Sequence, residues 1–286
     1  MKKVIFILIT FVSLIFTSCS NDYNDLTNQY NYSNEKQISI IFNGDFQYES
    51  FTRSSDISFA KDIWIFDYMN DELIQTVHQN YEDDNFGTPQ IKLKYGTHKM
   101  YFLMSGGDTP NHMQYIHTIT WQKMGDTFWG TATAEIKESS RSELRVMLDR
   151  VVSMIKINSI DNKPENAKYI KVIPEIWHYG INYLTGKPET YSENREILFE
   201  LDDNNTSNLE ICFYGTAAEE ESIQLQIFSL SQSKNVIKYI KFTSVPFMVN
   251  RITKITTKLF DNTDSGDYNY NFITNSAWNT GYVINK

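Results

Sequence analysis

Histidines are the side chains in this sequence that most readily bind metals or transfer protons. The chain has five, and none falls in the HExxH spacing that places two ligands on one face of a helix. His112 and His117 lie five residues apart, in segments expected to be loop and strand. Two acidic clusters, residues 82–84 and 202–205, offer oxygen ligands for Ca²⁺, but neither has the glycine and distal glutamate of a calcium loop. We predict no metal site and no cofactor. The histidines are expected to have structural roles, and the acidic clusters are expected to be solvated turns.

Catalytic groups also leave no recognisable pattern. The sequence has no GxSxG motif and no glycine-rich phosphate loop. A glycosidase needs two carboxylates at a fixed separation in a cleft, and sequence spacing does not reveal such a pair. Tryptophans could stack on sugars, but four of the five lie in or beside alternating segments, where core packing is the simpler interpretation. We therefore predict no enzymatic activity, with a hydrolase kept as a minor alternative. The five are Trp64, Trp121, Trp129, Trp177 and Trp278.

Cys19 is the side chain with the clearest predicted chemistry. Lys2 and Lys3 form a positive n-region, and residues 4–16 are almost entirely apolar. This run of about 13 residues is shorter than the ~20 that a transmembrane helix needs, so it is typical of an export signal. Thr17 and Ser18 then supply small residues directly before the cysteine. Cleavage before Cys19 would leave its thiol at the mature N-terminus, which resembles the lipobox of bacterial lipoproteins.

The stretch after Cys19 fits a membrane anchor. Residues 20–36 are polar and rich in asparagine, as in a flexible tether. Two or more acyl chains hold a protein stably at a membrane, whereas one holds it only marginally. We predict a signal peptide over residues 1–18, a lipidated Cys19 and a tether over residues 19–36. The expected location is the cell outer membrane, with the lipid-anchored protein exposed at the cell surface.

Composition excludes some classes of partner. The formal net charge is −9, and the acidic residues are spread along the chain. Nucleic-acid binding requires clustered lysine and arginine, so we predict no nucleic-acid partner. Cys212 is the second of two cysteines, and it has no partner for a disulfide once Cys19 is lipidated. We interpret Cys212 as a small buried residue and not as a reactive thiol.

Short alternating segments dominate the rest of the chain. Residues 222–228 (SIQLQIF) place Ile223, Leu225 and Ile227 on one face and glutamines on the other. Residues 91–95 (IKLKY) are expected to turn their first, third and fifth side chains inward. Residues 62–68 and 73–78 flank a polar turn and predict a hairpin. Helical periodicity is scarce, with at most a turn or two over residues 139–149.

This pattern predicts an all-β protein with more strands than one sandwich carries. The charged, aromatic-poor stretch at residues 138–149 is the best candidate for a break between domains. We predict two β-sandwich domains in series, over residues 37–143 and 144–286.

Several segments, taken in order, resemble a known family. Residues 62–73 (DIWIFDYMNDEL) are similar to a strand-turn of the fimbrillin-associated anchor and minor subunits of Bacteroidetes type V pili. Residues 95–105, 148–157 (LDRVVSMIKI) and 250–260 (NRITKITTKLF) are similar to later strands of that family, and Trp278 fits its C-terminal end. The chain departs from the family at its turn, which has Asn70-Asp71 in place of glycine, and at Ser153 in place of alanine.

The resemblance implies a fold and a mode of assembly. It implies two transthyretin-like β-sandwiches, with an extended segment of one subunit completing the sheet of another. In polymerising members an arginine-specific protease removes the first strand. Arg53 is the only arginine before residue 141 and follows the strand expected over residues 37–42. Arg53 is the candidate processing residue, although we favour the interpretation that it is a solvated loop residue.

Together these observations predict a structural subunit of a fimbria-like surface appendage, either an anchor or a minor or tip component. Its expected partners are other pilus subunits, met by strand exchange, and the outer membrane; a host or bacterial surface ligand is a further candidate. The alternative is a surface glycan-binding lipoprotein with the tryptophans as a platform. Burial of the tryptophans would favour the first prediction, and alignment on one exposed face the second.

Overall fold

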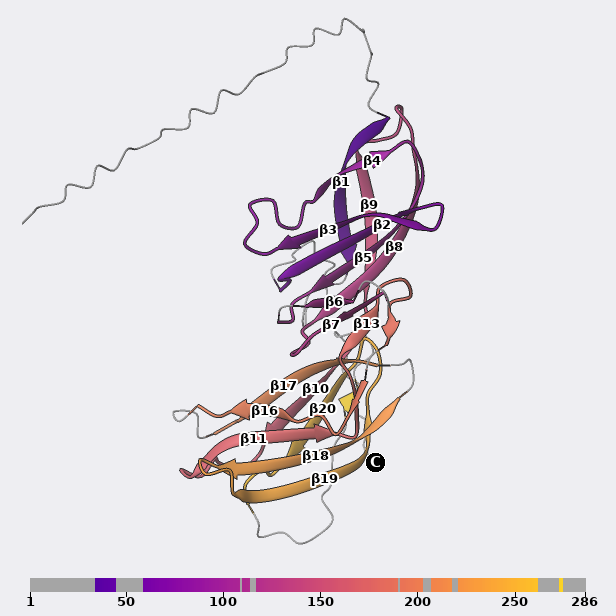
Figure 1. Ribbon diagram of the computed structural model, residues 1–286. Coiled ribbons are helices and arrows are strands. Elements are labelled where there is room, and N and C mark those ends of the chain that lie inside the picture. Colours follow the sequence, from indigo (N-terminus) through magenta and orange to yellow (C-terminus); the bar gives the residue numbers. More distant parts are fainter. Residues whose placement is uncertain are drawn as a thin grey trace, which may run out of the picture. The chain divides into compact units, whose positions relative to one another are not determined.

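A computed structural model of the protein describes residues 34–44, 59–108, 110–113, 117–189, 191–202, 207–217, 221–261 and 273–274. Every helix or strand assigned in these ranges is a β-strand, which confirms the all-β prediction (Figure 1). None of the described residues forms a helix of the length and apolarity that a membrane crossing requires.

Twenty-one strands are assigned in the described ranges. They are β1 (Glu35–Gly44), β2 (Asp62–Met69), β3 (Glu72–Asn80), β4 (Gln90–Lys94), β5 (Gly96–Ser105), β6 (Asn111–Met113), β7 (Thr118–Thr120), β8 (Thr127–Ile136), β9 (Glu143–Arg150), β10 (Val152–Ser159), β11 (Ala167–Pro174), β12 (Ile176–His178), β13 (Gly180–Asn182), β14 (Lys187–Pro188), β15 (Tyr191–Glu193), β16 (Ile197–Glu200), β17 (Glu210–Thr216), β18 (Ser222–Ser231), β19 (Val236–Pro246), β20 (Ile252–Thr257) and β21 (Ile273–Thr274).

The first β-sandwich is built from one sheet in the order β3-β2-β5-β8-β9-β1-β4. β8 and β9 pair at only two positions, so the sheet divides there into the layers β3-β2-β5-β8 and β9-β1-β4. All neighbouring strands are antiparallel except β1 and β9, which are parallel. Inward side chains of both layers form a single core, which includes Ile38, Ile40, Phe42, Ile63, Ile65, Ile91, Leu93, Met100, Phe102, Phe128, Val146 and Leu148.

The second β-sandwich has the sheets β15-β12-β17-β10-β20-β21 and β16-β11-β18-β19. Its core joins the inward side chains of both sheets, with Trp177, Phe213, Phe242 and Phe247 among the largest. Along β18, Ile223, Leu225 and Ile227 are buried, whereas the intervening glutamines are only half-buried. The predicted inward face of this strand is therefore confirmed.

The two sandwiches repeat one topology. In the first, β4-β1-β9 faces β3-β2-β5-β8; in the second, β17-β10-β20 faces β16-β11-β18-β19. Each opening strand, β1 or β10, has an antiparallel partner on one side and a parallel partner on the other. Two β-sandwiches thus follow each other along the chain, as the fold class predicted. The domain limits at residues 143 and 144 stay a prediction; β9, which begins there, pairs with β1.

Two local expectations can be compared with these strands. Residues 139–149 do not form a helical turn: from Glu143 they form β9, because Val146 and Leu148 alternate into the first core. The hairpin of β2 and β3 is present, and its turn residues Asn70 and Asp71 have φ values of 52° and 63°. Asparagine and aspartate tolerate this left-handed conformation better than most residues, so the turn forms without glycine.

A third sheet contains strands from both halves of the chain. In this bridging sheet, ordered β14-β13-β7-β6, the strands β6 and β7 come from the β5–β8 connection, and β13 and β14 from the β11–β16 connection. Ile119 and Ile181 of this sheet, with Tyr183 directly after β13, share a buried cluster with Phe66 of β2 and Leu103 of β5. The bridging sheet therefore covers the face of β2 that points away from the first core, which is why β2 is buried on both faces.

Candidate assembly site

β1 contacts its two neighbouring strands along different halves of its length. Residues 35–39 pair with β4, and residues 39–44 pair with β9. Ile38, Ile40 and Phe42 point into the first core and are at most 5% exposed. The position of β1 thus offers two backbone ladders and a row of apolar side-chain sites, which are the features that bind an added strand.

Side-chain and backbone contacts hold the beginning of β1. Lys36 donates hydrogen bonds from Nζ to the carbonyl oxygen of Glu138, at 2.6 Å, and to that of Ser140. The Tyr95 amide donates to the carbonyl oxygen of Asn34 at 2.7 Å. These bonds link β1 to the β8–β9 and β4–β5 connections. Lys36 lies within the predicted tether, so this role was not expected from the sequence.

A second strand-addition position lies at the C-terminal end of the described chain. β20 pairs with β10 on one side and with β21 on the other. The β21 ladder joins Thr253 to Thr274 and Lys254 to Ile273. Residues 273–274 therefore form an added strand at the edge of the second sandwich.

Asp161 fixes the chain where it leaves β20. Its carboxylate accepts hydrogen bonds from the backbone amides of Leu259, Phe260 and Asp261 at 2.7–2.8 Å. Ser159 also donates to it from Oγ. Burial alone would raise the pKa of Asp161, but the Ser159 and amide hydrogen bonds together outweigh burial, so its pKa lies below the ordinary value of 3.8.

We expect Asp161→Asn to lower the free energy of unfolding by about 1–3 kcal/mol at pH 7, because an amide cannot accept all of these bonds. A lowered folded-state pKa means that the carboxylate stabilises the fold fully above about pH 4. This stabilisation is lost as the pH falls through the folded-state pKa. Urea unfolding of both proteins from pH 7 to pH 3 should show the difference shrinking on acidification; a difference independent of pH would contradict the assignment.

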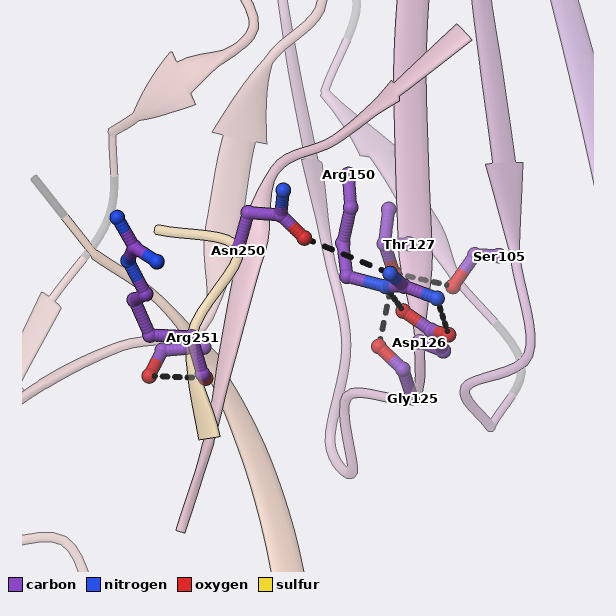
Figure 2. A network of polar contacts seen from close by, with 8 residues as sticks. Ser105, Gly125, Asp126, Thr127, Arg150, Asn250 and Arg251 are labelled. Carbon is purple, nitrogen blue, oxygen red and sulfur yellow. Dashed lines mark hydrogen bonds and ion pairs between the residues drawn. The ribbon is translucent and has the colours of Figure 1, made fainter. Parts of the chain in front are cut away.

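Arg150 connects the first sandwich to the entry of the second. Its Nε and Nη2 donate to the two carboxylate oxygens of Asp126 at 2.7 and 2.9 Å, and Nη1 donates to Asn250 Oδ1 at 3.4 Å (Figure 2). The guanidinium also lies over the Phe128 ring, 4.5 Å from its centre. Asn250 precedes β20, and its backbone N–H donates a hydrogen bond to the carbonyl oxygen of Val152 at the start of β10. The two parallel hydrogen bonds from Arg150 to Asp126 are called the fork below. Together with the contacts to Phe128 and Asn250, this fork connects β8, β9 and the β19–β20 connection.

The residues with predicted roles in anchoring and processing lie outside the described part of the chain. These residues are Cys19 and Arg53. Trp278, which resembles the C-terminal end of the family, also lies outside the described residues. Their roles stay predictions.

Two of the described histidines contact carboxylates of neighbouring strands. His98 is 1% exposed, and its ring nitrogens lie 2.7 Å from Asp67 Oδ1 and 2.8 Å from the carbonyl oxygen of Lys94. His78 Nε2 lies 2.6 Å from Asp62 Oδ1. Among the described residues, no group of three histidine, cysteine or acidic side chains has a metal-binding arrangement.

The described tryptophans do not line one exposed face. Trp121 and Trp177 are 2% and 3% exposed and belong to two different cores. Trp64 and Trp129 are half-buried; Trp64 stacks against Phe66, and Trp129 donates from Nε1 to the carbonyl oxygen of Tyr183 at 2.7 Å. The distribution favours packing over a sugar-binding platform.

Cys212 lies on β17 and is half-buried, so the prediction of a fully buried residue is wrong. Burial, and next the nearby Glu210 carboxylate, raise the pKa of its thiol to about 11. The thiol is therefore protonated at neutral pH, which agrees with the interpretation that it is unreactive.

Comparison with known proteins relates the chain to others by its fold alone. No protein-family model matches the sequence, and no curated protein sequence matches it significantly. Several solved structures share the fold. A proposed polysaccharide-binding protein of Bacteroides thetaiotaomicron has a TM-score of 0.55 and 9% identity, over 88% of this chain and 100% of that one.

Two further structures have names that refer to surface appendages or adhesion. A fimbrial assembly protein of Parabacteroides distasonis has a TM-score of 0.50 and 11% identity, over 87% of this chain and 99% of that one. A proposed cell-adhesion protein of Bacteroides ovatus has a TM-score of 0.51 and 10% identity, over 84% and 96%. The chain therefore shares its fold with these three proteins along nearly their whole length.

Proposed function

We propose that this protein is a structural subunit of a fimbria-like surface appendage, either an anchor or a minor or tip component, and a member of the fimbrillin superfamily. It is held at the outer membrane by a lipidated Cys19 and joins other pilus subunits by β-strand exchange. The observation that carries this proposal is the position of β1, which combines two partial ladders with three buried side chains. The shared fold with a fimbrial assembly protein supports it.

The proposal gives Arg53 a conditional role. Arg53 lies between β1 and β2 in sequence, so cleavage after it would separate β1 from the rest of the chain. In a subunit that keeps its lipid, such cleavage would also separate the anchor from both sandwiches. An anchor subunit must therefore remain uncleaved at Arg53 and keep β1. A polymerising subunit would be cleaved there and would lose both β1 and the lipid anchor.

The alternative function is that of a surface glycan-binding lipoprotein with a tryptophan platform. The name of one structural neighbour, a proposed polysaccharide-binding protein, is consistent with it. The burial of Trp121 and Trp177 speaks against a platform, because neither indole presents a face to solvent.

Membrane anchoring gives the most accessible test. Mass spectrometry of the mature protein should show an acylated Cys19 and no residue upstream of it. Cys19→Ala should leave the protein out of the membrane fraction, because the acyl chains supply the anchoring free energy, about 0.8 kcal/mol for each buried CH₂. Cys212→Ala is the matched control and should fractionate like the wild type. Membrane retention of the Cys19→Ala protein would contradict lipid anchoring.

A further inference from the structure

A polar cleft lies beside the bridging sheet, away from β1 and β21. Its volume is about 570 Å³, within the usual size range of small-molecule sites. The lining includes Asp108, Asn111, Trp121, Gln122, Tyr179 and Arg195. These residues come from the connections around β6 and β7 and from those around β12 to β15, so strands of both halves of the chain position them.

Arg195 is the main charged group of this cleft. Its guanidinium carbon lies 4.6 Å from the centre of the Tyr179 ring, and Nη2 donates to the carbonyl oxygen of Gln122. No described carboxylate forms an ion pair with it, and its neighbour Glu196 pairs with Lys171 instead. Burial lowers the pKa of Arg195, whereas Tyr179 acts in the opposite direction. The ring and the carbonyl fix the orientation of the guanidinium and leave further N–H donors for an anion.

The buried side chain of Trp121 also lines this cleft. Trp121 is 2% exposed, and its indole N–H has no hydrogen-bond partner among the described residues. The Trp121 amide donates to the carbonyl oxygen of Tyr179 at 3.0 Å, which holds the two aromatic residues together.

We propose that this cleft binds a carboxylate-bearing saccharide, with Arg195 as the carboxylate-binding residue. Arginine binds carboxylates through two parallel N–H bonds. The carboxyl and amide groups of Asp108, Asn111 and Gln122 provide acceptors and donors for sugar hydroxyls. Arg195 is the one cation among the described lining residues, and the carboxylate of Asp108 repels a doubly charged phosphate more strongly than a singly charged carboxylate. This inference does not depend on the fimbrial role, and either can fail without the other.

The test is calorimetric titration of the full-length protein with a galacturonic acid trimer. The methyl-esterified trimer, which keeps every hydroxyl but lacks the charge, is the matched neutral ligand. Triglutamate and inorganic phosphate are the other probes. The wild type should bind the acidic trimer and not its ester. Absence of trimer binding, equal binding of the ester, or stronger binding of triglutamate or phosphate would overturn the proposal.

Variants locate the site. Arg195→Gln should weaken trimer binding about 10- to 100-fold, and Arg195→Lys by less, because lysine keeps the charge but loses the fork. Arg141→Gln, at an exposed arginine outside the cleft, should bind normally. If Arg195→Gln changes the thermal unfolding of the protein, the exposed Asn111→Ala provides the independent measurement and should weaken binding several-fold. Unchanged binding in both the Arg195→Gln and Asn111→Ala proteins would overturn the assignment.

Discussion

Arg150→Ala should lower the free energy of unfolding by about 3–5 kcal/mol, which is the usual cost of removing one member of a buried ion pair. The side chain of Arg150 is 2% exposed and that of Asp126 is 12% exposed, so water replaces little of the lost contact. The substitution removes both hydrogen bonds of the fork and the contact with Phe128. It also removes the link to Asn250 ahead of β20.

Chemical denaturation followed by tryptophan fluorescence measures this effect. Arg145→Ala is the matched control, because Arg145 lies on the same strand with an exposed side chain, and it should change stability by less than about 0.5 kcal/mol. Arg150→Lys should fall between the two, since lysine keeps the charge but cannot form the fork. If Arg150→Ala behaves like Arg145→Ala, the fork contributes little to stability.

Leu225→Ala should cost about 2–5 kcal/mol, because it removes a fully buried side chain and leaves a cavity. Leu225 pairs with Pro174 of β11 and Phe242 of β19, in the middle of its sheet. The neighbouring Gln224→Ala should cost less than about 0.5 kcal/mol, since its side chain points to the other face. The same denaturation experiment compares them, and equal losses would contradict the assigned faces of β18.

Strands with one buried face were predictable from the sequence, because a side-chain period of two identifies the inward residues. Ile38, Ile40 and Phe42 in β1 are an example, as is β18. The pattern misleads at strand ends: Tyr95 was expected inside but is 38% exposed. β4 ends at Lys94, and Gly96, at a φ of 141°, begins β5, so the alternation does not extend to Tyr95.

The candidate sites were less predictable, because they depend on contacts between distant residues. Lys36 binds carbonyl oxygens about 100 positions away, and Asp161 binds amides at a similar separation. The strands of the bridging sheet are only two or three residues long, too short for an alternating pattern. Arg150 had one sequence signal, since this charged residue continues the alternation of the inward-facing Val146 and Leu148 along β9.

Strand exchange is the central claim, and co-purification from cells tests it most directly. The amount of partner pilus subunits recovered with the full-length protein is compared with that recovered after deletion of residues 268–286, which removes β21. Deletion of residues 281–286 is the control for a shortened chain, and thermal unfolding checks that the first sandwich still folds. If the C-terminal segment is the donor strand, the longer deletion should abolish recovery of the partners while the control retains it. Normal recovery with the longer deletion, and again after removal of residues 37–53, would contradict assembly by strand exchange.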